Sequence, residues 1–90
     1  MKVEFSEQAL EDLLQLLDRQ PKLARKLGKL LQEIRRNPFS GTGKPEPLKY
    51  ELTGWWSRRI SQEHRLVYRI VTDQDGKQIC KILQCLTHYG

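Results

Sequence analysis

The side chains able to do chemistry gather in the second half of this 90-residue chain. They are basic residues, one carboxylate between prolines, two histidines and a tyrosine: Lys44, Glu46, Lys49, Arg58, Arg59, His64, Arg65, Arg69, His88 and Tyr89. A carboxylate serves as a general base, arginine complements phosphate charge, and histidine titrates closest to neutral pH. Such a set could cleave RNA without a metal ion, because RNA carries its own nucleophile, the 2′-OH.

In that reaction a base takes the 2′-OH proton, arginine stabilises the equatorial oxygens of the phosphorane, and an acid protonates the leaving 5′-oxygen. The products would be a 2′,3′-cyclic phosphate and a free 5′-OH. Each acid or base contributes about 10²–10⁴-fold to the rate. Taken singly, Glu46, Arg65 and His88 are each more often solvated surface groups, so only their convergence in one groove would make a site.

The bulk composition narrows the classes of protein. Ninety residues fit one domain, expected to span residues 1–90. No apolar run approaches the roughly 18 residues of a membrane span, and the acidic start MKVEFSEQALEDLL does not resemble a signal peptide, so we expect a cytoplasmic protein. The net charge of +5 indicates a polyanionic partner such as nucleic acid, a ribosome or an acidic protein.

The two cysteines, Cys80 and Cys85, are five residues apart in a strand-like segment. Odd spacing places them on opposite faces of a strand, about 16 Å apart, whereas a disulfide requires Cα atoms within about 7 Å. We therefore expect two reduced, packed thiols. The cysteines and histidines do not have zinc-ligand spacing, so neither a metal nor a cofactor is expected.

The first half of the chain predicts a short strand over residues 2–5 and two helices. Ser6 is a candidate N-cap for a helix over residues 7–19, whose apolar face would consist of Leu10, Leu13, Leu14 and Leu17. Pro21 suits the first turn of a second helix that ends before Pro38. Leucines and Ile34 mark one face of this helix. The other face is basic, and is either simply solvated or a docking surface for an acidic partner: Lys22, Arg25, Lys26, Lys29, Arg35 and Arg36.

The second half predicts strands joined by short loops. Residues 38–48 are rich in proline and glycine, which excludes a regular helix and disfavours a central strand. The four strands that follow are expected over residues 48–52, 55–61, 64–73 and 77–89, with a turn at Gln62-Glu63 and a hairpin at Asp75-Gly76. The order indicates an α+β domain, with two N-terminal helices packed on a mostly antiparallel, twisted sheet of about five strands.

The run NPFSGTGKPEPLKYELTGWWSRRISQEHRLVYRI, residues 37–70, resembles the YoeB-type toxins of the RelE superfamily, which belong to bacterial type II toxin–antitoxin pairs. The most specific pieces are GTGKPEPLK, GWWSRRI and EHRLVYRI, and the terminal His-Tyr agrees as well. The resemblance implies a RelE-like, microbial-RNase-like fold. It also implies a metal-independent endoribonuclease that cleaves messenger RNA in the decoding site of the ribosome and so inhibits translation.

Carried over by position, the resemblance assigns a role to each matching residue. It implies that Glu46 is the general base, that Arg65 stabilises the phosphate charge, that His88 is the general acid and that Tyr89 shapes the site. His64 is expected to be structural. The predicted RNA-binding residues are Lys44, Lys49, Arg58 and Arg59. Two departures from the family pattern are Gly90 after the His-Tyr and a last hairpin, TDQDGKQICKI, that looks longer than usual.

The same resemblance implies the partners. They are an acidic YefM-like antitoxin, the ribosome with its messenger RNA, and operator DNA contacted through the toxin–antitoxin complex. Family members also form homodimers, and a homodimer is possible here. Two alternatives stay open. One is a superfamily toxin that acts on DNA gyrase without a nuclease site. The other is a basic module that only binds an acidic protein or nucleic acid.

Overall fold

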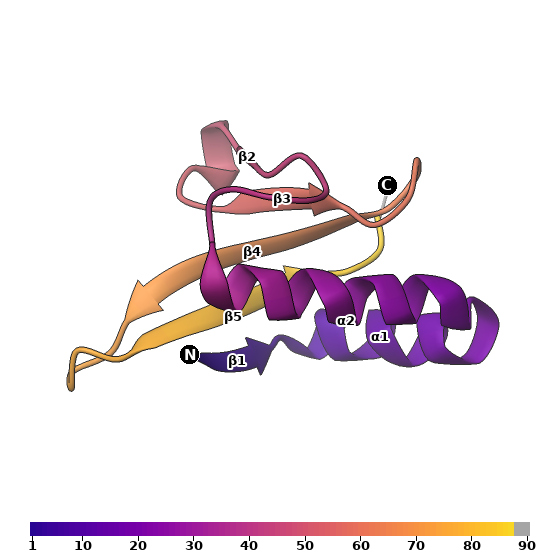
Figure 1. The fold of residues 1–90 in the computed structure, drawn as a ribbon, viewed down its shortest axis with the longest axis horizontal. Coiled ribbons are helices and arrows are strands. Elements are labelled where there is room, and N and C mark those ends of the chain that lie inside the picture. Colours follow the sequence, from indigo (N-terminus) through magenta and orange to yellow (C-terminus); the bar gives the residue numbers. More distant parts are fainter. Residues whose placement is uncertain (88–90) are drawn as a thin grey trace.

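The computed structural model describes residues 1–87, which form a helical hairpin and a five-stranded sheet (Figure 1). In chain order the elements are β1 (Lys2–Phe5), α1 (Glu7–Arg19), α2 (Pro21–Arg36), β2 (Glu46–Pro47), the 3-10 helix η1 (Tyr50–Leu52), β3 (Trp56–Arg59), β4 (Arg65–Thr72) and β5 (Gln78–Gln84). No described helix has the length and apolar character needed to cross a membrane.

The sheet has the strand order β1-β5-β4-β3-β2. β1 is parallel to β5, and every other neighbouring pair is antiparallel. A parallel pair requires a long connection between its strands, and the two helices with the other three strands supply it here. The predicted α+β fold, with two helices on a mostly antiparallel sheet, is confirmed.

The helix boundaries follow from the capping residues. The Ser6 hydroxyl accepts a hydrogen bond from the Ala9 N–H at 3.0 Å, which caps α1 as predicted. Gln20 separates the helices, and Pro21 occupies the first turn of α2, where its missing N–H costs no helical hydrogen bond. α2 ends at Arg36, just before Asn37 and Pro38. The predicted bounds of both helices therefore hold to within a residue.

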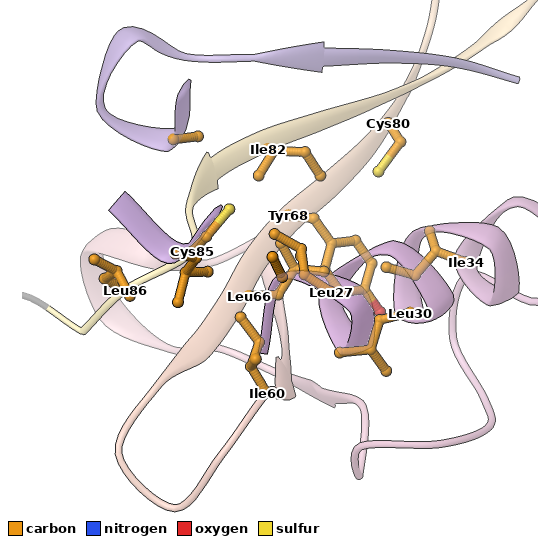
Figure 2. Packing of buried hydrophobic residues seen from close by; sticks show 13 residues of the cluster. Leu27, Leu30, Ile34, Ile60, Leu66, Tyr68, Cys80, Ile82, Cys85 and Leu86 are labelled. Atoms are coloured by element: carbon orange, nitrogen blue, oxygen red, sulfur yellow. The ribbon is translucent and has the colours of Figure 1, made fainter. Parts of the chain in front are cut away.

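The hydrophobic core lies between α2 and the sheet (Figure 2). α2 contributes Leu27, Leu30 and Ile34, which are buried as its apolar periodicity predicts. The sheet and the ends of its strands contribute the other labelled members: Ile60, Leu66, Tyr68, Cys80, Ile82, Cys85 and Leu86. One continuous cluster thus joins the second helix to β4, to β5 and to the residues that directly follow β3 and β5.

The predicted apolar face of α1 is wrong as a core face for three of the four leucines assigned to it. Leu10, Leu14 and Leu17 are 49%, 56% and 54% exposed, and Leu13 alone of that set is partly buried. The buried residues of this helix are Ala9, Asp12 and Leu16. The inward face is selected by Asp12, because its carboxylate accepts the backbone N–H groups of Cys85 and Leu86 beyond β5. Apolar spacing alone carries no information about that polar requirement.

The strand expected over residues 48–52 is also wrong. Tyr50–Leu52 forms η1, and a two-residue edge strand, Glu46–Pro47, pairs with β3 in its place. The Thr53 hydroxyl and N–H both donate to the Tyr50 carbonyl, at 2.7 and 3.1 Å, and Gly54 continues with a φ of +96°. These local hydrogen bonds favour a turn over an extended strand. Pro47 is compatible with β2 because an edge strand has one unpaired side.

Cys80 and Cys85 are both free and buried, in agreement with the prediction of two packed cysteines that do not pair with each other. The expectation that they occupy opposite faces is wrong, because both belong to the same hydrophobic cluster. β5 ends at Gln84, so the alternation of a strand does not extend to Cys85. Burial raises the pKa of Cys80 to about 11 and that of Cys85 to about 12, with the Asp12 carboxylate adding to the second shift.

Candidate active site

The sheet face opposite the helices brings together two predicted site residues from distant parts of the sequence. Glu46 lies on β2 and Arg65 begins β4, and Arg65 Nη1 donates to Glu46 Oε1 at 2.6 Å. β3 runs between them, with Ser57 opposite Glu46 and Arg59 opposite Arg65. Because side chains alternate along strands, these four share one face. The two charged side chains are 55% and 40% exposed, so the pair is open to a ligand.

Ser57 lies between the members of this pair and was not among the predicted site residues. Its side chain is buried, and its hydroxyl is 3.5 Å from Arg65 Nη1. The signal that could have found it is strand alternation, since Ser57 is two positions from Arg59 on β3 and shares its face. Ser57 supports the guanidinium of Arg65 from below the exposed surface.

Arg58 points into the interior and is fully buried, which corrects its predicted role as an RNA contact. Its Nη2 donates to the carbonyl oxygens of Asn37 and Ser40 at 2.6 and 2.8 Å. Its Nη1 donates to the carbonyl oxygen of Thr42 at 3.2 Å and to the carboxylate of Glu33 at 3.3 Å. A buried guanidinium engaged in this way has no surface to offer RNA. Arg58 instead holds the loop that leads from α2 to Glu46.

Tyr68 and Glu33 complete the network around Arg58. Arg58 Nε donates to the Tyr68 hydroxyl at 3.1 Å, and that hydroxyl donates to the Pro38 carbonyl at 2.6 Å. Burial raises the pKa of Tyr68, which keeps the phenol protonated as a donor. Hydrogen bonds from Thr42 lower the pKa of Glu33, and Arg58 lowers it further. Both groups therefore have the protonation state that the network requires.

Two glycines let the loop approach β3 closely. Gly43 has a φ of +86°, and a Cβ there would lie 3.1 Å from the Arg59 carbonyl oxygen. The Gly43 carbonyl accepts the Arg59 N–H at 2.7 Å. Gly41, with a φ of +119°, leaves no room for a Cβ beside the Glu33 carboxylate. The sequence GTG is thus the local reason that the loop delivers Glu46 to the edge of the sheet.

The remaining predicted RNA-binding residues lie around the pair. Lys44, Lys49 and Arg59 are all exposed, the first in the loop, the second just before η1 and the third at the end of β3. On the same sheet face the Arg69 guanidinium lies 5.4 Å from the ring centroid of Trp55, a cation–π contact. These positions agree with a basic surface around Glu46 and Arg65. Arg59 is the cross-strand neighbour of Arg65, but among residues 1–87 no side-chain hydrogen bond or ion pair joins the three predicted residues to that pair.

His88 and Tyr89, the predicted acid and its neighbour, lie outside the described residues, as does Gly90. The structure does place the residue before them. The Thr87 N–H donates to Nδ1 of His64 at 3.2 Å, and the Thr87 hydroxyl donates to the Glu63 carbonyl at 2.6 Å. His64, predicted to be structural, therefore contacts the segment that leads to His88, and it directly precedes Arg65 in the chain.

The chemistry available at this face is acid–base and electrostatic. Glu46 provides an accessible carboxylate, and Arg65 provides guanidinium donors beyond the one that contacts Glu46. Within residues 1–87, no three histidine, cysteine, aspartate or glutamate side chains are grouped so as to hold a metal ion. The Glu46–Arg65 pair therefore suits a reaction in which one group of the substrate is deprotonated next to a centre that gains negative charge.

The fold and its structural neighbours place this protein in the class of small α+β toxins of the RelE superfamily. The solved structure of the YoeB/ParE toxin from Agrobacterium tumefaciens superposes with a TM-score of 0.91 at 37% identity, covering 99% of this chain and 100% of that one. The YoeB dimer from Staphylococcus aureus gives a TM-score of 0.85 at 44% identity, and the YoeB–YefM complex from the same organism gives 0.84 at 43%. In both cases the match covers 99% of this chain and 98% of the other.

The family follows from the sequence comparisons. The family described as "YoeB-like toxin of bacterial type II toxin-antitoxin system" matches residues 5–89. Toxin YoeB of Escherichia coli strain K12 is 43% identical over 89 residues, covering 99% of this chain and 100% of the relative. The chain therefore belongs to the YoeB-like toxins of bacterial type II toxin–antitoxin systems.

Proposed function

We propose that this toxin is a metal-independent endoribonuclease that cleaves messenger RNA in the decoding site of the ribosome and thereby inhibits translation. The observation that carries the proposal is the 2.6 Å contact between Glu46 and Arg65, which are 19 positions apart in the sequence. A base and a phosphate-binding cation at this separation can act on one phosphodiester. The known activity of the family agrees with this chemistry.

The roles follow from the needs of the reaction. Glu46 takes the proton of the 2′-OH, and Arg65 binds the non-bridging oxygens as negative charge develops on them. Arg65 can do so while contacting Glu46, because a guanidinium has five N–H donors. His88 protonates the leaving 5′-oxygen and Tyr89 shapes the site. These two assignments rest on the family pattern, and the bond between Thr87 and His64 supports them by bringing the segment to the neighbour of Arg65.

The surface proposed to bind RNA consists of Lys44, Lys49 and Arg59, without Arg58. These three cations are exposed, and they come from the chain segments that flank Glu46 and Arg65. Phosphate contacts of this kind give binding that weakens steeply as salt concentration rises. The partly exposed Trp55 beside Arg69 offers a further surface against which a base could stack.

The proposed partners extend what the relatives' structures name. The solved complex from Staphylococcus aureus contains YoeB together with YefM. By analogy, an acidic YefM-like antitoxin would bind and neutralise this toxin in the bacterial cytoplasm. The exposed basic face of α2 offers charge complementarity to such a chain. The complex would bind operator DNA through the antitoxin, and a homodimer is proposed from the YoeB dimer of that organism. The remaining proposed partner is the ribosome with its messenger RNA.

The test compares two carboxylate variants with matched chemistry. Glu46→Gln removes the proposed base, whereas Glu51→Gln makes the same change at an exposed carboxylate on η1. Both proteins are added to a translation extract, and cleavage of a defined message is measured by primer extension. We expect Glu46→Gln to lose about 10²-fold or more of the cleavage rate and Glu51→Gln to retain it. Equal rates for the two variants, in folded proteins, would refute the assignment of Glu46.

A further inference from the structure

The segment after β5 is held by side chains rather than by the sheet. The backbone N–H groups of Cys85 and Leu86 both donate to Oδ2 of Asp12, at 2.9 and 3.1 Å. The next N–H, that of Thr87, donates to Nδ1 of His64 at 3.2 Å. Three successive amides are therefore bound by acceptors on α1 and on the β3–β4 loop. The path of the chain toward His88 is set by these acceptors.

The acceptors are themselves fixed. Asp12 is buried, and its other carboxylate oxygen accepts from Gln8 Nε2 at 3.0 Å. The His64 backbone is closed into the loop, because its carbonyl accepts the N–H groups of Ile60 and Ser61 at 2.9 and 3.2 Å. The Ser61 hydroxyl accepts the His64 N–H at 3.1 Å. An acceptor held in this way can impose a position on the group that it binds.

We propose that His64 is a positioning residue that fixes Thr87, the residue directly before His88, relative to Arg65. Thr87 directly precedes His88, and His64 directly precedes Arg65, so their hydrogen bond joins the neighbours of the proposed acid and the proposed phosphate-binding cation. This inference rests on the proposed function. It adds a role for His64 beyond maintaining the fold, since misplacing a reacting group by about 1 Å costs about 10²-fold in rate.

The bond constrains the state of the imidazole. Nδ1 can accept from Thr87 only when it carries no proton, which places the ring proton on Nε2. The Glu63 carboxylate is 3.8 Å from Nε2, and the Glu63 carbonyl binds the Thr87 hydroxyl at the same time. The loop therefore presents an acceptor to the Thr87 amide and a second acceptor to its side chain.

The first arm of the test measures the bond itself. His64→Asn keeps an acceptor oxygen three bonds from Cα, as Nδ1 is, whereas His64→Leu has nearly the same shape without an acceptor. Amide hydrogen exchange of Thr87 is followed by NMR in each protein. We expect exchange about tenfold faster or more in the leucine variant and within about threefold of wild type in the asparagine variant. The Cys85 and Leu86 amides, held by Asp12, are internal controls that should not change.

The second arm measures the reaction. Single-turnover cleavage is followed on ribosomes programmed with a defined message, over a range of toxin concentrations, with Gln62→Ala as an exposed control in the same loop. His64→Leu should lower the maximal rate about 10–100-fold without changing the half-saturating toxin concentration. His64→Asn should restore the rate to within about threefold of wild type. If His64→Leu does not fold, His64→Ala replaces it in both arms.

The two arms separate the possible failures. Equal Thr87 exchange in the leucine and asparagine variants would overturn the proposed bond, whatever the RNA assay gives. Faster exchange with an unchanged maximal rate would overturn the positioning role. A wild-type protein that cleaves no message would overturn the proposed function and with it the catalytic part of this inference. The exchange data would still decide whether His64 holds the segment.

Discussion

The buried guanidinium of Arg58 gives the sharpest prediction about stability. Arg58 makes five hydrogen bonds to loop carbonyls, Glu33 and Tyr68. Lysine keeps the charge but has three donors, so Arg58→Lys loses at least two of these bonds. At about 1.5–3 kcal/mol for each bond to a charged group, the loss is about 3–6 kcal/mol. Since domains are stabilised by about 0.05–0.15 kcal/mol per residue, this is a large part of the total for this chain.

The matched control is the next residue in the chain. Arg59 has the same side chain but is exposed on the other face of β3, so Arg59→Lys should change the free energy of unfolding by less than about 0.5 kcal/mol. Urea denaturation followed by circular dichroism gives both values from one experiment. A loss for Arg58→Lys within about 0.5 kcal/mol of that for Arg59→Lys would refute the reasoning. It would mean that the loop does not depend on the guanidinium fork.

Two further predictions concern the core. Leu16→Ala should destabilise the protein by about 2–5 kcal/mol and Leu14→Ala by less than about 0.5 kcal/mol, because only Leu16 is buried; similar losses in thermal denaturation would contradict the observed face of α1. The free energy of unfolding should fall between about pH 9 and pH 11, by about 1.4 kcal/mol per pH unit for each buried thiol. The unfolded cysteines ionise there, while Cys80 and Cys85 keep their protons to about pH 11 and 12. Cys85→Ala should reduce this slope in urea titrations at pH 8 and pH 10, and an unchanged slope would exclude this cause.

Local signals were sufficient for most of the fold. The serine cap, the proline at the start of α2 and the Asp75-Gly76 turn each act through nearby backbone, so sequence identifies them directly. In the observed hairpin, Asp73 accepts the N–H groups of Asp75 and Lys77 at 2.9 Å, and Gly76 has a φ of +77°. Alternation and helical periodicity then give β1, β3, β4, the buried face of α2 and most of β5, which ends at Gln84 rather than continuing to residue 89 as predicted.

The structural features that could not be predicted from the sequence depend on contacts between residues that are far apart in the chain. Asp12 faces the interior, where its carboxylate accepts hydrogen bonds from backbone amides 73 and 74 positions away. No local sequence pattern reveals these contacts. The burial of Arg58 could not be predicted for the same reason. Strand alternation places Arg58 and Arg59 on opposite faces of the sheet, but the sequence does not show which of the two faces the helices cover. The pairing of Glu46 with Arg65 was anticipated only through the family resemblance. Its geometry required the sheet register.

The order of the strands also has a consequence for biosynthesis. β1, made first, has β5 as its neighbour in the sheet, and β5 is the last of the described strands to be synthesised. A nascent chain that stalls before residue 78 contains both Glu46 and Arg65 but has no partner strand for β1 and no long neighbour for β4. Such fragments lack a complete core and should be harmless to the cell that makes them. Toxicity is thereby withheld until β5 has been synthesised.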